Sequence, residues 1–155
     1  MSPAGRAAAS ERPRFERSKI GLSFVETISS TLPGASRMVA KVLRVAERIK
    51  CGQAELDKVE LALREALTNA IIHGNLRSLR KRVTVRCYCQ PDCGMLLVVE
   101  DEGSGFNPKK IPGPTRGRNI YSSHGRGIYL MRKVMDEVRF QRSGSRVVLK
   151  KRRRR

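Results

Sequence analysis

Glu65, Asn69 and His73 are the first residues whose types and spacing suggest chemistry. They stand four residues apart in REALTNAIIHGN, so a helix places them along one edge. A carboxylate one turn from a carboxamide can orient a nucleophile and hold a hydrated cation. A polar helix edge, with Glu65 paired to a neighbouring base such as Arg64, explains the same pattern. At a helix end, His73 can equally be a capping or packing residue.

The segment DEGSGF, residues 101–106, follows an apolar stretch that reads as a strand. Gly103 and Gly105 allow positive φ and a close approach of the backbone to a flat ligand. Asp101, fixed at the end of the strand, could accept a hydrogen bond from an exocyclic amine such as that of adenine. The same Asp-x-Gly-x-Gly pattern also occurs in ordinary turns, so it does not settle the question alone.

A third segment, SHGRGIYLM, places Gly125 and Gly127 at the expected start of a helix. Free N–H groups and the helix dipole suit a phosphate there, and Arg126 adds a positive charge. His124 could contact phosphate or cap the helix, and we favour the cap. Two glycines are a weak signal, but the three segments follow one another in a fixed order.

The elements that must position these residues follow from apolar periodicity. Alternation predicts strands and a stripe every three to four residues predicts helices, with Gly74-Asn75 ending the second helix. A loop of about twenty residues, a length typical of functional or mobile segments, precedes the third helix. The predicted elements are a strand over 19–29, helices over 32–51 and 55–73, strands over 82–90 and 94–101, a helix over 125–137 and a hairpin over 138–151.

This order predicts an α+β fold: a two-layer sandwich in which a mostly antiparallel, mixed sheet is covered on one face by helices. The expected organisation is a disordered tail over 1–17, one domain over 18–150 and a basic tail over 151–155. The sequence shows no apolar run long enough to span a membrane and no leader of the secretory kind, so a cytoplasmic protein without membrane contact is expected.

The formal net charge of +19 raises the possibility of a nucleic-acid partner. Much of this charge lies in the two ends, including KKRRRR at 150–155. Such a tail attracts any polyanion without reading its sequence. Because the sequence contains neither a recognition motif nor a platform of aromatic residues, we expect no specific nucleic-acid binding.

Four cysteines raise the question of a metal site. Cys87, Cys89 and Cys93 read C-x-C-x3-C, which lacks the second pair of ligands typical of structural zinc. Alternation in VTVRCYCQ puts Cys87 and Cys89 on the same face as Val83. We therefore expect all four cysteines, Cys51 included, to be core thiols in a reducing environment.

Taken together, REALTNAIIHGN, VVEDEGSGF and HGRGIYLM resemble the three ATP-binding boxes of the gyrase, histidine-kinase and MutL (GHKL) superfamily, which has the Bergerat fold. Within it, the chain resembles the stand-alone serine/threonine kinase domains that act as anti-sigma factors. The resemblance covers residues 18–151.

The resemblance implies a role for each residue. Glu65 is implied as the general base and Asn69 as the ligand of a Mg²⁺ ion that bridges the ATP phosphates. Asp101 is implied to bind the adenine amino group. The implied lid covers 106–124, with Lys109 and Arg116 as further candidates for phosphate contact. The remaining residues implied in nucleotide binding are His73, Gly103, Gly105, Gly125, Arg126 and Gly127. Many members have a supporting Thr in the last hairpin, where this chain offers only Ser145.

The function implied is transfer of the ATP γ-phosphate to Ser or Thr of a small anti-anti-sigma protein of the STAS type, with control of transcription by partner switching. A sigma factor is the second implied partner, and a homodimer is suggested. The alternative is a sigma-binding module whose conformation responds to ATP without phosphotransfer.

Overall fold

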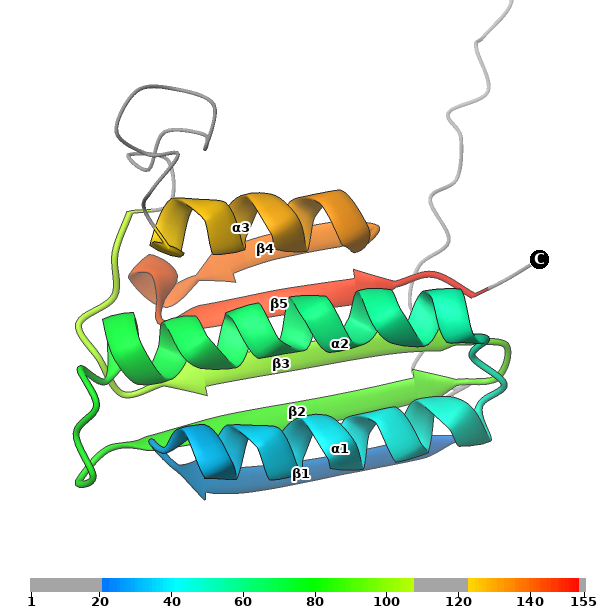
Figure 1. Ribbon diagram of the computed structural model, residues 1–155, viewed down its shortest axis with the longest axis horizontal. Coiled ribbons are helices and arrows are strands. Elements are labelled where there is room, and N and C mark those ends of the chain that lie inside the picture. Colours follow the sequence, from blue (N-terminus) through cyan, green and yellow to red (C-terminus); the bar gives the residue numbers. More distant parts are fainter. Residues whose placement is uncertain (1–20, 108–122, 154–155) are drawn as a thin grey trace, which may run out of the picture.

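A computed structural model describes residues 21–107 and 123–153, apart from the side chains of 123 and 124. Its strands form one sheet in the order β1-β2-β3-β5-β4. The helices α1, α2 and α3 all lie over the same face of this sheet (Figure 1). In chain order the elements are β1 (Leu22–Ser29), α1 (Leu32–Arg48), α2 (Gln53–Thr68), a π-helical turn (Asn69–Gly74), β2 (Arg82–Gln90), β3 (Gly94–Asp101), α3 (Ser123–Val134), β4 (Glu137–Gln141), a 3-10 turn (Arg142–Gly144) and β5 (Arg146–Lys151).

The predicted α+β sandwich with helices on one face is confirmed, but the sheet is not mixed. All four strand pairings among the described residues are antiparallel. Because the edge strand β4 precedes β5 in the chain, β5 lies between β3 and β4 and pairs with both. The end of β3 and the start of β5 therefore lie side by side.

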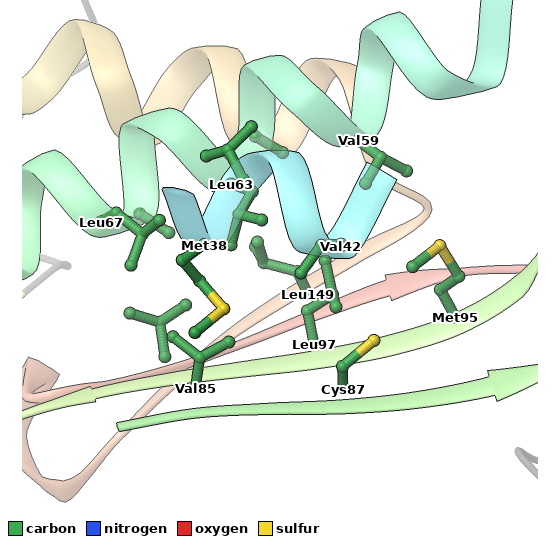
Figure 2. Packing of buried hydrophobic residues seen from close by; sticks show 14 of the residues in the cluster. Met38, Val42, Val59, Leu63, Leu67, Val85, Cys87, Met95, Leu97 and Leu149 are labelled. Atoms are coloured by element: carbon green, nitrogen blue, oxygen red, sulfur yellow. The ribbon is translucent and has the colours of Figure 1, made fainter. Parts of the chain in front are cut away.

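Alternating apolar residues give β2 its buried face, on which every second side chain is covered. Helix α1 begins at Thr31, whose hydroxyl accepts a hydrogen bond from Gly34 N at 3.1 Å, and Pro33 lies in the first turn. Figure 2 shows the resulting core, in which apolar side chains of α1 and α2 meet those of β2, β3 and β5. Fully buried members include Met38, Val42, Val59, Leu63, Val85, Leu97 and Leu149.

The expectation that all four cysteines are free core thiols is correct for two of them. Cys87 and Cys89 are free and fully buried, on the face predicted from the alternation. Cys51 and Cys93 are also buried, but they form a disulfide across 42 residues of sequence. It joins the turn between α1 and α2 to the β2–β3 turn. Two turns this far apart in sequence carry no local pattern that pairs them.

The second predicted helix does not keep α-helical geometry to its end. Its last five residues, together with Gly74, form the π turn, in which Asn75 N donates to Ala70 O at 2.8 Å. A π turn is wider than an α turn, so the predicted four-residue ridge is regular from Glu65 to Asn69 but not onward to His73.

The expected tail over 1–17 lies outside the described residues, and β5 includes Lys151, one residue beyond the expected end of the domain. Within the described residues, none of the helices is both long enough and apolar enough to span a membrane.

Candidate functional site

Asp101 lies at the end of β3 and is held by both backbone and side chain. Its backbone N donates to Ser145 O in the neighbouring hairpin at 2.9 Å. Its Oδ1 accepts from Gly103 N at 2.8 Å. The carboxylate lies directly against Gly74, where an added Cβ would be 2.3 Å from Oδ2. The end of the π turn therefore packs directly against the Asp101 side chain.

Gly103 and Gly105 are required by close backbone contacts rather than by a turn alone. A Cβ at Gly103 would lie 2.0 Å from the carbonyl oxygen of Gly74. Gly105 has a φ of +80°, and a Cβ there would lie 2.0 Å from the carbonyl oxygen of Ser143. Neither oxygen can move as a flexible side chain can, so any larger residue must displace the loop.

Gly127, near the start of α3, lies against the segment that carries Glu65 and Asn69, at the end of α2 and the start of the π turn. A Cβ at this position of α3 would lie 2.5 Å from Oε2 of Glu65 and 3.6 Å from Nδ2 of Asn69. Because Gly127 has no side chain, α3 packs closely on α2 at the edge that carries the carboxylate and the carboxamide. The predicted ridge residues and the predicted helix start are thus in direct contact.

A small pocket with a volume of about 10 Å³, the space of about one water molecule, lies between α2, α3 and the ends of the central strands. Asn69 and Asp101 are both on its wall, with Ser145 beside them. The other lining residues are Ala66, Ala70, Val99, Met131, Phe140, Gly144 and Val147. This is the usual composition of a small-molecule site: mostly apolar walls with a few converging polar groups.

Burial raises the pKa of both carboxylates in this region. For Asp101, desolvation is the main cause, opposed by the hydrogen bond from Gly103 N and by the charge of Lys81. For Glu65, desolvation again raises the pKa, and the nearby Arg126 guanidinium lowers it. A carboxylate whose pKa is raised toward neutrality is a better proton acceptor for a hydroxyl at physiological pH.

Asn69 is 9% exposed, and its Nδ2 is buried without a hydrogen-bond partner among the described residues. Because Nδ2 is a hydrogen-bond donor, it fits an acceptor oxygen of a ligand, such as a phosphate oxygen, whereas a Mg²⁺ ion would be held through Oδ1 of the same side chain together with substrate phosphates and water. The described residues contain no cluster of three or more His, Cys, Asp or Glu side chains suited to a metal.

The other predicted residues are less closely gathered. His73 lies on the π turn, partly buried, and is not among the residues that line the pocket. Burial lowers the pKa of His73. Gly125 is buried at the start of α3, and Arg126 is exposed. Of the predicted lid, residues 108–122 lie outside the described residues, and Lys109 and Arg116 with them, whereas the backbone of 123 and 124 forms the start of α3.

Several residues of this site were not among the predicted site residues, although Ser145 was noted as the only candidate for a supporting hydroxyl in the last hairpin. Ser145 supplies a carbonyl to Asp101 N and lines the pocket, although it stands 44 positions along the chain from Asp101. Gly74 was noticed only as a helix end. Asn75, beside it, is fully buried and hydrogen-bonded to three other segments. The only sign of this role in the sequence is that Asn75, a polar residue, directly follows the glycine that ends a helix.

The fold and the three converging segments define a nucleotide-binding ATPase domain. A family model for the histidine kinase-like ATPase domain matches residues 28–151, and the chain belongs to this family.

Two bacterial proteins have sequences similar to this chain. The chain is 33% identical over 103 residues to the serine-protein kinase RsbW of Bacillus subtilis, a match that covers 63% of this chain and 64% of that protein. It is 32% identical over 102 residues to the anti-sigma F factor of Clostridium acetobutylicum, covering 63% of this chain and 70% of the relative. The first match thus spans slightly less than two thirds of that relative's length.

Proposed function

We propose that this protein is an ATP-dependent serine/threonine kinase of the anti-sigma type, which phosphorylates a small anti-anti-sigma protein. The observation that carries the proposal is the contact of Gly127 with Glu65 and Asn69, beside the pocket that Asp101 lines. Phosphoryl transfer requires positioned phosphates, a metal ligand and a base for the attacking hydroxyl. Candidate residues for these three requirements lie close together, around Gly127 and the pocket.

The roles follow from position. Asp101 would accept a hydrogen bond from the adenine amino group, with Gly103 and Gly105 keeping the wall of the pocket thin. Asn69 would hold a Mg²⁺ ion through its side-chain oxygen, and the ion would supply positive charge to neutralise the ATP phosphates. The start of α3, with Gly125 and Arg126, suits the phosphates because its N–H groups and dipole favour anions.

Glu65 would act as the general base. The hydroxyl oxygen of the substrate Ser or Thr attacks the γ-phosphorus, its proton passes to the Glu65 carboxylate, and the bond to the bridging oxygen of ADP breaks. The raised pKa of Glu65 supports this role, because a poised carboxylate takes the proton more readily.

The partners are proposed from the relatives named as a serine-protein kinase and an anti-sigma factor. The substrate would be a STAS-type anti-anti-sigma protein, and a sigma factor would compete for the same chain in the cytoplasm. A homodimer is the expected assembly. Switching would follow from phosphorylation, which changes the charge of the substrate and so its affinity.

Phosphotransfer can be tested with ATP labelled on its γ-phosphate, Mg²⁺, and the small regulatory protein encoded beside this chain. The wild type should label a Ser or Thr of that protein. Glu65→Gln should lower the rate by roughly 10²- to 10⁴-fold, the usual size of a general-base effect. Glu60→Gln is the matched control: it lies on the same helix in an exposed pair with Arg64, and it should retain the wild-type rate.

Two other results would overturn different parts of the proposal. Equal transfer by wild type and Glu65→Gln would remove Glu65 from the mechanism. ATP binding and ATP-dependent capture of a sigma factor, without any transfer by the wild type, would instead support the alternative of a non-catalytic binding module.

A further inference from the structure

Asn75 is fully buried, yet the proposed chemistry assigns it no role. It stands one residue beyond the π turn, whose last residue, Gly74, lies against the Asp101 carboxylate. A buried carboxamide costs free energy unless its donors and acceptor are paired. Each polar atom of the Asn75 side chain does have a protein partner, so the residue holds something in place.

Two of these bonds fix Asn75 to the framework. Its Nδ2 donates to Ser30 Oγ at 2.7 Å and to Arg82 O at 2.9 Å. Ser30 in turn donates to Lys81 O at 2.8 Å. The β1–α1 turn and the start of β2 are thereby joined to the end of the π turn.

The third bond points toward the candidate site. Glu102 N donates to Asn75 Oδ1 at 2.8 Å. Asp101 N, one residue earlier, donates to Ser145 O. The two peptide N–H groups on either side of the Asp101 side chain are therefore held from different segments: one by β5's hairpin, the other by Asn75.

We infer that Asn75 is a positioning residue for nucleotide recognition, which holds the Glu102 amide so that the Asp101 carboxylate faces the adenine base. This inference rests on the proposed function, since it presupposes that Asp101 reads adenine. The π turn contributes to this positioning, because it places Gly74 against the Asp101 carboxylate and Asn75 against the Glu102 amide. Asn75 touches neither Glu65 nor Asn69 in the contacts that it makes through its side chain.

The position of Asn75 predicts a particular kinetic pattern. Loss of its Oδ1 should loosen Asp101 while leaving the base and the metal ligand in place. Asn75→Ala should therefore weaken ATP binding about tenfold and raise KM for ATP by a similar factor. The loss of one positioning hydrogen bond typically weakens binding by about this much. The kcat at saturating ATP should change little, and the preference for ATP over GTP should shrink.

Ser30→Ala separates positioning from stability. It removes one of the two framework bonds of Asn75, the bond to Ser30 Oγ, and leaves the bonds to Arg82 O and Glu102 N intact. Both variants should lower the melting temperature, and only Asn75→Ala should change nucleotide preference. If both variants bind ATP and GTP with the wild-type ratio, the inference is wrong. If the wild type binds no ATP, the proposed function itself fails.

A measurement on the unmodified protein covers the case in which Asn75→Ala does not fold. Glu102 is exposed, and its amide donates to Asn75 Oδ1 at 2.8 Å. In hydrogen exchange on the wild type, this amide should be protected well above the exposed amides of neighbouring loop residues. Exchange at the rate of an unstructured peptide would show that Asn75 does not hold the loop, and would overturn the inference.

Discussion

The two ends of helix α2 differ in how they are held, and the difference separates function from stability. At the end that meets α3 and the tip of β3 (left in Figure 1), backbones approach each other at glycines and carboxylates have raised pKa values. At the opposite end, a disulfide joins two turns and Lys151 pairs with Glu55 at 2.6 Å. Polar groups are left under-satisfied at one end and are paired at the other.

The cysteine end also contains backbone strain. Lys50, Asp92 and Cys93 have φ values of 61°, 60° and 68°, which side chains rarely adopt. All three lie in the two turns joined by the disulfide, and Cys93 N donates to Ile49 O at 3.0 Å. A covalent link that holds strained turns suggests that this end serves stability. Positive φ also occurs near the nucleotide end, at Leu76, Arg77, Arg142 and Ser143, but the disulfide among the described residues lies at the cysteine end. The covalent link, rather than the strain, therefore distinguishes the cysteine end.

The largest expected effect comes from breaking the cysteine end. Replacing Cys51 and Cys93 by serine should lower the free energy of unfolding by about 4 kcal/mol, because the disulfide closes a loop of about forty residues in the unfolded chain. Denaturant unfolding measures this loss. ATP affinity of the folded double variant should stay within about twofold of the wild type. A large loss of affinity would show that the two ends are coupled.

Gly127→Ala tests the nucleotide end with little cost to folding. The new methyl group would meet the flexible end of Glu65, so the carboxylate can move aside. Alanine is also favoured over glycine in a helix by about 1 kcal/mol. We expect stability to be retained and phosphotransfer to fall about 100-fold, because the base is displaced. Gly21→Ala, whose Cβ would meet no atom within 4 Å, is the control. An unchanged rate in Gly127→Ala would contradict the proposed role of Glu65.

The smallest effect is a difference in pH dependence between the ends. Burial raises the pKa of Glu65 above 4.5, so stability from this group is present at low pH and is lost as pH rises through the raised value. The hydrogen bond from Lys151 lowers the pKa of Glu55, so its contribution is lost as pH falls below about 4.5. Glu65→Gln should raise the melting temperature slightly at pH 7 and not at pH 4. Glu55→Gln should lower it at pH 7.

Much of the fold could be predicted because its signals are local. The strands over 82–90 and 94–101 have the predicted bounds, since alternation marks both and a tight turn separates them. Pairings between distant segments could not be predicted. Cys51 meets Cys93, and Ser145 meets Asp101, only because the sheet order places them together.

The candidate site, too, has residues that local sequence indicates and residues that it does not. Glu65 and Asn69 were predicted from a helical spacing, and Asp101 from its place after a strand. The contact of Gly127 with α2, and the role of Asn75 beyond the π turn, depend on how helices pack, which neither residue's neighbours in sequence reveal.

The affinity of Asp101→Asn for ATP tests the nucleotide end most directly. Titration calorimetry with Mg²⁺ and ATP should show binding by the wild type and a loss of roughly 10- to 100-fold in the variant, because a hydrogen bond to a charged acceptor is replaced by an unfavourable contact between two amino groups. The Asn side chain can still accept from Gly103 N, so the loop should remain folded. Equal affinity for ATP in wild type and Asp101→Asn would contradict the assignment of this end as the adenine site.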